Sequence, residues 1–163
     1  MTQELLAQAQ EKLSIYMQAL SDTQYSAMPS PTLSLNQRGT IAGAAILQKH
    51  HIRLQPTLFE QNKTYFLEQV LPHELAHLIA HRFYGKVSPH GREWQHIMEG
   101  VFKRPAIRTH QLDISRLGLK RFSYACSCGE VALSIRRHNK VVNKQQSYIC
   151  RTCRQTLAFV AEK

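Results

Sequence analysis

Residues 66–79 read FLEQVLPHELAHLI, in which His73 and His77 enclose Glu74 in an H-E-x-x-H pattern. Helical positions i and i+4 share one face, so the two imidazoles can reach one metal ion. Glu74 lies beside that face, where a carboxylate can take a proton from a water that the metal activates. The alternative is a buried helix that carries two histidines by chance. With 9 His and 9 Glu among 163 residues, a shuffled chain would hold roughly 0.03 such patterns, so we favour a metal-binding helix.

A zinc site that keeps one position open for water needs a third protein ligand. His81 lies two helical turns from His73, which is too far along the axis to share the ion easily. His90 lies in the segment SPHGREW, residues 88–94, where Pro and Gly indicate a loop that leads into a helix over residues 92–102. A loop ligand can fold back onto the first helix, so we favour His90. The competing candidates lie on the following helix: Glu93, His96 and Glu99.

The rest of the first hundred residues predicts helices around a short sheet. Apolar residues recur at helical spacing over residues 2–20, which indicates an amphipathic core helix. Strands are predicted over residues 32–36, 40–47 and 51–55, separated by turn-like residues. The metal-binding helix is predicted over residues 65–83, with a kink at Pro72 and an end at Gly85.

The charge of the chain is distributed unevenly. Residues 1–102 hold 8 Lys and Arg and 8 Asp and Glu, so their net charge is 8 − 8 = 0. Residues 103–163 hold the remaining 21 − 8 = 13 basic and 11 − 8 = 3 acidic residues, which carry the whole formal charge of +10. This distribution indicates that the basic region binds a polyanionic partner such as nucleic acid. The less favoured interpretation is that the basic region only increases solubility.

The basic region also holds all four cysteines, as the pairs Cys126-Ser127-Cys128 and Cys150-Arg151-Thr152-Cys153. Such pairs predict a structural zinc site of four thiolates. The segment that contains them would form a small ribbon, which has too little hydrophobic core to fold well without a metal. The C-x-C spacing of the first pair is unusually short, so a site of three cysteines and His138 is the second choice. A redox pair at Cys150 and Cys153 is the third, because no thioredoxin-like pattern surrounds it.

Short strands are predicted in this ribbon over residues 131–137, 147–149 and 157–160, with residues 136–140 as a basic loop. The side chains predicted to follow a phosphate backbone are Arg136, Arg137, Lys140, Lys144, Arg151 and Arg154. Phe122, Tyr124 and Tyr148 are candidates for stacking on unpaired bases, although such aromatics more often pack against the ribbon. With no sequence-reading helix evident, binding is expected to be sequence-tolerant and sensitive to salt.

The segment from residue 66 to residue 102, with HELAH followed by HGREW, resembles the SprT family, which is related to the Spartan-type proteases that digest proteins crosslinked to DNA. The resemblance continues through AGAA at 42–45, IRLQP at 52–56, YACSC at 124–128 and YICRTC at 148–153. It implies an α+β fold, with a zincin-like (minimal gluzincin-type) metalloprotease domain over residues 1–115 and a basic zinc ribbon over residues 116–163. It also implies a catalytic zinc on His73, His77 and His90, a catalytic Glu74, and a connection to nucleic acid.

The function expected from the residues and the resemblance together is zinc-dependent hydrolysis of peptide bonds in proteins that are associated with or crosslinked to DNA. The ribbon is expected to bind DNA that is single-stranded, or to bind DNA in a sequence-tolerant way. Arg92, His96 and Tyr84 are candidates for stabilising the oxyanion. No apolar run long enough to span a membrane is present, so a location in the cytoplasm or at the nucleoid is expected. Two alternatives are a non-catalytic zinc protein that binds nucleic acid and a small-substrate metallopeptidase with an incidental basic tail.

Overall fold

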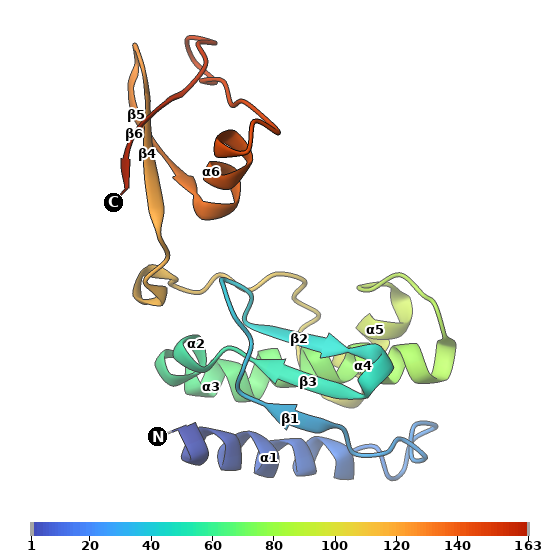
Figure 1. Cartoon of the computed structure of the whole chain (residues 1–163). Helices are drawn as coiled ribbons and strands as arrows, with labels where there is room; N and C mark the ends of the chain where they lie inside the picture. Colours follow the sequence, from blue (N-terminus) through green and yellow to red (C-terminus); the bar gives the residue numbers. More distant parts are fainter. Residues whose placement is uncertain (1, 163) are drawn as a thin grey trace. The chain divides into compact units, whose positions relative to one another are not determined.

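The computed structural model describes residues 2–162 and divides into two compact units, Met1–Leu117 and Gly118–Lys163, each with its own hydrophobic core (Figure 1). The fold is α+β in both units. The elements of the first unit are α1 (Thr2–Gln18), β1 (Thr32–Ser34), β2 (Gly43–Ile46), η1 (Leu47–Lys49), β3 (His51–Leu54), α2 (Pro56–Gln61), α3 (Lys63–Tyr65), η2 (Phe66–Val70), α4 (Leu71–Tyr84), α5 (Arg92–His96), η3 (Ile97–Val101) and η4 (Ser115–Leu117).

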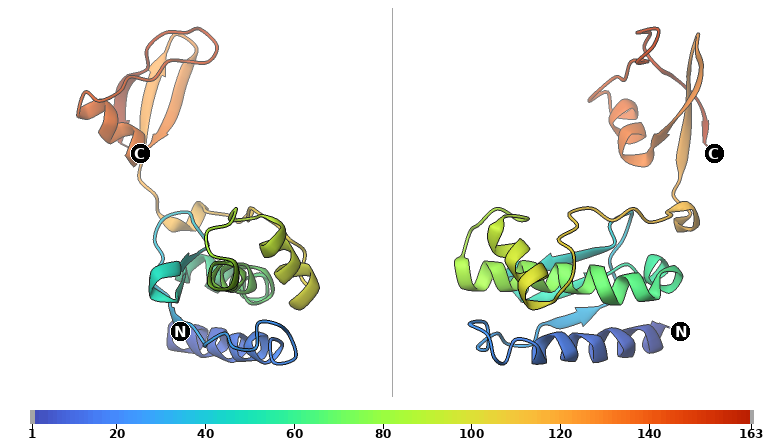
Figure 2. Two further views of the ribbon diagram at one scale, coloured as in Figure 1. Left: turned by 90° about the vertical axis from the view of Figure 1, so that its right-hand side faces the viewer. Right: turned by 180° about the vertical axis from the view of Figure 1, so that it is seen from behind.

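The sheet of the first unit has the strand order β1-β3-β2, with β1 parallel and β2 antiparallel to β3. Along β3 the apolar residues Ile52 and Leu54 are buried, while His51 and Arg53 face the other side of the sheet. Alternate side chains of a strand point to opposite faces, so one face joins the core and the other stays polar. Helix α4 packs on the apolar face, α1 lies beside β1, and no helix of the described residues covers the polar face (Figures 1 and 2). The three strands were predicted, but each ends earlier than predicted, and the second also begins later, at Gly43, and is followed by the turn η1.

Pro72 lies in a continuous stretch of helical backbone, as the sequence predicts, because η2 passes directly into α4 with helical dihedral angles at Val70 and Leu71. It is the second residue of α4, where it has no N–H to donate to the preceding turn. The preceding residues form the π-helical turn η2, whose wider spacing leads into α4 without a break. Helix α4 ends as predicted at Gly85, whose positive φ of 71° favours glycine. The predicted helix over residues 92–102 is likewise divided into α5 and the π-helical turn η3.

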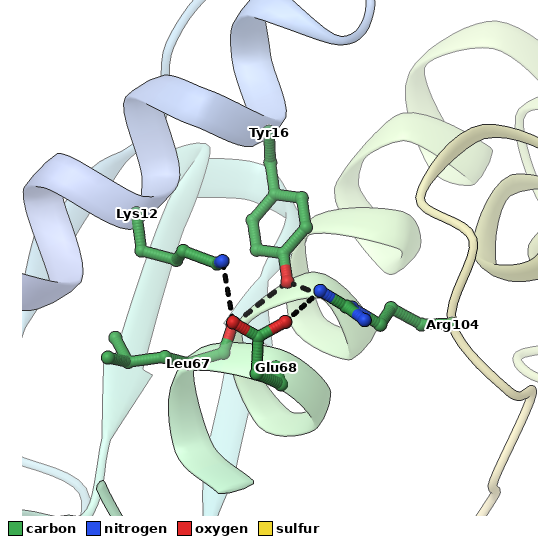
Figure 3. A network of polar contacts seen from close by, with 5 residues as sticks. All are labelled: Lys12, Tyr16, Leu67, Glu68 and Arg104. Atoms are coloured by element: carbon green, nitrogen blue, oxygen red, sulfur yellow. Dashed lines mark hydrogen bonds and ion pairs between the residues drawn. The ribbon is translucent and has the colours of Figure 1, made fainter. Parts of the chain in front are cut away.

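A polar network connects α1 to segments that precede and follow α4 in the sequence (Figure 3). Glu68 of η2 pairs with Lys12 of α1, with 2.6 Å between Oε1 and Nζ, and with Arg104, which follows η3. The Tyr16 hydroxyl donates to the Leu67 carbonyl at 3.0 Å. Because these charged side chains are partly exposed, each ion pair contributes at most about 1 kcal/mol. The network therefore fixes the approach of α1 more than it stabilises the fold, which depends on buried residues such as Leu5 and Leu13.

The second unit is a three-stranded antiparallel sheet with the order β5-β4-β6 and one helix, from β4 (Arg121–Cys126), β5 (Gly129–Ser134), α6 (Ile135–Val142) and β6 (Ala158–Glu162). The prediction of a strand over residues 131–137 ending in a basic loop is wrong beyond Ser134, because the basic residues form α6. Helical spacing lets His138 and Val141 turn toward the small core while Arg136 and Arg137 face solvent. Strand β4 was not predicted, and residues 147–149 contribute only an isolated bridge between Ile149 and Thr156.

Among the described residues, no helix has the length and apolar character needed to cross a membrane. The longest helix, α1, carries exposed polar residues along one face.

Candidate metal centres

Three histidines of the first unit converge on one point. The Nε2 atom of His73 lies 3.1 Å from Nε2 of His77 and 3.2 Å from Nε2 of His90. Tetrahedral zinc with Zn–N bonds of about 2.05 Å would place its nitrogen ligands about 3.3 Å apart. Three imidazole nitrogens at this spacing therefore fit a zinc ion that keeps a fourth position open, and the chemistry of the donors suits zinc.

The surroundings of the three rings direct their Nε2 atoms toward this point. The Nδ1–H of His73 donates to the Ile107 carbonyl at 3.2 Å. The ring of His77 donates to the backbone carbonyl of Pro89, because a proline has no N–H to donate. Such outer partners fix the tautomer that leaves the other nitrogen free for a metal. The buried Trp94 of α5 contacts all three rings, and its Nε1–H donates to the His73 carbonyl at 3.2 Å.

The electrostatic environment keeps these imidazoles neutral, as metal ligands must be. Burial, with the neighbouring histidines as a further cause, lowers the pKa of His73 to about 3 and that of His77 to about 4. The pKa of His90 is also lowered, by burial and by the positive charge of Arg108. Deprotonated nitrogens that face one another without a proton between them are suited to share a cation.

Glu74 is positioned beside the histidines by α4 and is only 6% exposed. Burial raises the pKa of its carboxyl to about 7, while a hydrogen bond from the Ala45 backbone lowers it in part. A carboxyl group with a pKa near neutrality can both accept and return a proton, which is the property that a general base requires. Glu74 is thus held against the edge strand β2 at the side of the histidine cluster.

The backbone of β2 approaches Glu74 closely at Gly43. A Cβ atom at this position would lie 2.9 Å from Cγ and 3.1 Å from Oε1 of Glu74, and 3.0 Å from Cγ1 of Val70. Only a glycine therefore allows the carboxylate to occupy its observed place. Nothing in the predicted strand pattern identified this role, because the contact joins two elements that are 31 residues apart in the sequence.

Gly43→Ala is expected to displace the Glu74 carboxylate and to lower the rate of any reaction that needs it by about 10- to 100-fold, since a misplacement of about 1 Å can cost that much. Zinc binding should persist, because the three histidines do not contact Gly43. Turnover, zinc content and the melting temperature of the variant would be compared with those of the wild type. A folded, zinc-loaded Gly43→Ala protein with undiminished turnover would contradict the positioning role of this glycine.

A cleft of about 600 Å³ opens next to the histidine cluster. Its walls are the β2 edge at Ala44 and Ala45, the helix α4 at Glu74, His77 and His81, and the loop from Gly85 to Pro89. Among the described residues, strand β2 pairs with β3 on one side only, so its other side, apart from the Ala45 N–H that bonds Glu74, has backbone groups available for an added strand. The cleft thus brings an edge strand, a candidate base and a candidate metal site together.

The remaining candidates of the first unit lie outside the cluster. His81 lines the cleft but is not one of the three clustered histidines. Among the described residues, Glu93, His96 and Glu99 belong to no cluster of side chains that could hold a metal ion. The Tyr84 hydroxyl is 2.8 Å from that of Tyr25, in a structural pair at the end of α4. Arg92 and His96 are exposed on α5, and no contact of theirs supports a role at the oxyanion.

Sequence reasoning missed two neighbours of the cluster, Arg108 and His110. Arg108 acts on the pKa of His90, and the ring of His110 lies 5.0 Å from that of His73. The Nδ1 atom of His110 is 2.9 Å from the Tyr65 hydroxyl, while its buried Nε2 atom has no hydrogen-bond partner within residues 2–162. Both residues belong to the irregular segment between η3 and η4, which has no periodicity from which its path could be predicted.

In the second unit, the sulfur atoms of Cys126, Cys128, Cys150 and Cys153 lie within 4.8 Å of one another. Four thiolates at this spacing match a closed structural zinc site, for which sulfur atoms about 3.8 Å apart are expected. His138 lies elsewhere: its ring stacks on Phe122 with 3.7 Å between centroids, and its Nδ1 is 3.0 Å from the Tyr124 hydroxyl. The geometry thus favours four cysteines over three cysteines and His138.

The predicted nucleic-acid-binding side chains of the ribbon are exposed, except for Lys140, which is half-buried. Among the described residues none of the six is in an ion pair; they are Arg136, Arg137, Lys140, Lys144, Arg151 and Arg154. The suggestion that Phe122 and Tyr124 stack on bases is wrong, because both are buried around His138. Tyr148 is half-buried beside Arg137, whereas Phe159 of β6 is exposed.

The comparisons with known proteins cover both units. Residues 9–115 match the SprT-like family, and residues 120–160 match the SprT-like zinc ribbon domain. The chain is 47% identical over 145 residues to protein SprT of Yersinia pseudotuberculosis, covering 89% of this chain and 85% of that protein. It is 52% identical over 135 residues to protein SprT of Proteus mirabilis, covering 82% and 80%, and 50% identical over 131 residues to that of Vibrio atlanticus, covering 80% and 79%. No solved structure gives a significant match.

Proposed function

This chain belongs to the SprT-like family, and on that basis we propose that it is a zinc-dependent metallopeptidase with a zincin-like catalytic unit and a ribbon that binds nucleic acid. The observation that carries the proposal is the arrangement of His73, His77 and His90 around one point, with the buried Glu74 beside them and a cleft in front. A purely structural metal site would not need a buried carboxyl group that opens onto a cleft.

The residues of the site divide the reaction between them. His73, His77 and His90 would hold the ion, which when bound polarises the scissile carbonyl and lowers the pKa of a water. Glu74 accepts a proton from the attacking water and delivers it to the nitrogen of the leaving amine. The buried Trp94 and the backbone of Ile107 hold the histidine rings in place. The β2 edge binds an extended substrate through main-chain hydrogen bonds, which suits unfolded or flexible polypeptide.

The proposed substrates are proteins that are associated with or crosslinked to DNA. The charge split supports this, because the unpaired basic side chains of the ribbon are suited to a phosphate backbone and the first 102 residues are neutral. The four cysteines would hold a second zinc that maintains the ribbon. In this proposal the ribbon concentrates DNA-bound proteins near the peptidase unit.

Cleavage of a basic DNA-binding protein by the zinc-loaded chain, with and without single-stranded DNA, tests the proposal. Cleavage is expected to require zinc, to stop after chelation and resume on adding zinc, and to be faster with DNA. Raising the salt concentration should reduce the stimulation by DNA, because phosphate contacts release counterions. DNA binding without any cleavage would instead support a non-catalytic zinc protein, and cleavage indifferent to DNA would support a peptidase unrelated to nucleic acid.

A further inference from the structure

A second cavity, of about 360 Å³, lies on the polar face of the first sheet, away from α4. We call it the outer pocket; it is lined by Thr32, Asn36, Ile46, Lys49, His51 and Arg53. These residues come from β1 and the turn after it, from the end of β2 and η1, and from β3. No acidic residue lines the cavity, although the first 102 residues as a whole hold as many acidic as basic side chains.

The two cations of the outer pocket lack acidic partners. Within residues 2–162, neither Lys49 nor Arg53 takes part in an ion pair. The Arg53 guanidinium is oriented by a neutral group, the Gln37 side-chain oxygen, which accepts from Nε at 3.2 Å and from Nη2 at 2.9 Å. These contacts use two of its five N–H groups and leave the positive charge uncompensated. Two neighbouring unpaired cations favour an anion between them.

The third nitrogenous group of the outer pocket, His51, is bound at both ring nitrogens. Its Nδ1 is 2.6 Å from the Thr32 hydroxyl and its Nε2 is 2.8 Å from the Ser34 hydroxyl. The Ser34 hydroxyl donates to Asn36 Oδ1 at 2.8 Å, so Nε2–H donates to Ser34 and Nδ1 accepts from Thr32. Burial, Arg53 and Lys49 lower the pKa of His51 in that order. The ring is therefore neutral. It links β3 to β1 through these hydrogen bonds and leaves the positive potential of the cavity unchanged.

From this convergence of Lys49 and Arg53 on an acid-free cavity with polar walls, we infer that the outer pocket binds one phosphate group of a nucleic-acid backbone. A phosphodiester offers oxygens to both cations at once, and the planar fork of Arg53 suits such an anion. The Asn36 amide supplies a neutral donor at the rim. No Phe, Tyr or Trp lines the cavity, and the His51 ring is bound at both nitrogens, so the cavity holds the backbone rather than a base.

The position of the outer pocket relates it to the cleft. The continuous segment of residues 44–49 lines both cavities, with Ala45 and Leu47 on the cleft and Ile46 and Lys49 on the outer pocket. A phosphate held by Lys49 is thus separated from a polypeptide along β2 by the thickness of that one segment. This inference rests on the proposed function, since it places the nucleic acid next to the substrate of the peptidase unit.

The test is a two-dimensional NMR titration of the full chain with inorganic phosphate and, separately, with a four-nucleotide oligothymidylate. Both ligands are expected to shift the resonances of Thr32, Lys49, His51 and Arg53. Lys49→Gln should weaken the oligothymidylate affinity read from these resonances about fivefold and reduce its dependence on salt by about one counterion. Lys63→Gln removes an exposed charge of the same unit outside the pocket and should change that affinity less than twofold.

Shifts with inorganic phosphate alone would overturn the assignment to nucleic acid, and shifts with neither ligand would overturn the phosphate site. Equal weakening by Lys49→Gln and Lys63→Gln would also overturn it, because it would reflect overall charge only. The proposed function is tested separately from the phosphate site. Cleavage of a DNA-free protein by Lys49→Gln should equal that by the wild type. If the wild type did not cleave that protein, the peptidase activity would be refuted, with no consequence for phosphate binding.

Discussion

Replacing Glu74 by glutamine is expected to reduce peptide hydrolysis by about 10³-fold while leaving the fold and the zinc content unchanged. General acid–base catalysis contributes about 10²- to 10⁴-fold in enzymes, and no other carboxylate of the described residues lines the cleft. Glutamine has the shape of glutamate, and its side-chain oxygen can still accept the hydrogen bond from Ala45, but it cannot take a proton from water.

The stability of this variant separates a catalytic role from a structural one. Glu74 is 6% exposed, and burial raises the pKa of its carboxyl to about 7, so the ionised form is costly to keep in the apoprotein. A neutral amide removes that cost, and the metal-free Glu74→Gln protein should be at least as stable as the wild type. A residue retained only for stability would show the opposite, with a lower melting temperature and little effect on turnover.

Single-turnover cleavage, zinc analysis and thermal unfolding of the two proteins would measure these effects. Glu99→Gln is the matched control, because Glu99 is an exposed carboxylate on η3 and its replacement should leave turnover within twofold. Wild-type turnover by Glu74→Gln would refute the role of Glu74 as the base and would favour the non-catalytic alternative.

The histidine cluster could be predicted from the sequence because its chemistry depends on local spacing. The i and i+4 positions of His73 and His77 are fixed by the helix itself, and His90 follows after a short loop. The supporting contacts could not be predicted in the same way. Ile107 and Trp94 reach His73 across 34 and 21 residues, and Gly43 reaches Glu74 through the packing of β2 on α4.

The errors in secondary structure arose where two conformations compete for one stretch of sequence. Residues 131–137 alternate like a strand, yet from Ile135 onward the pairing partners along β4 are used up, since Arg121 already pairs with Ser134. The chain then turns, and α6 places His138 on Phe122. Pro72 shows the reverse case, because a residue that normally interrupts a helix is accommodated where the π-helical turn η2 passes into α4.

Replacing Cys150 by serine is expected to unfold the ribbon and to lower the zinc content from two ions per chain to one. The core of this unit is small, with five buried apolar residues: Phe122, Tyr124, Leu133, Cys150 and Leu157. A structural zinc site contributes about 10–16 kcal/mol to the folding of a small domain, which is more than such a core supplies. Cys150 is also the most buried of the four cysteines, so its loss removes a ligand and a core contact together.

The effect should stop at the boundary between the units, because the first unit has its own core and its own candidate metal site. NMR spectra of Cys150→Ser should lose the dispersed resonances of residues 118–162 and retain those of the first unit, and cleavage of a DNA-free protein should persist while stimulation by DNA is lost. Thr152→Ser is the control, since Thr152 is exposed in the same turn and offers no metal ligand. A Cys150→Ser chain that still bound two zinc ions and kept a folded ribbon would show that three cysteines suffice, and would reopen the question of a fourth ligand such as His138.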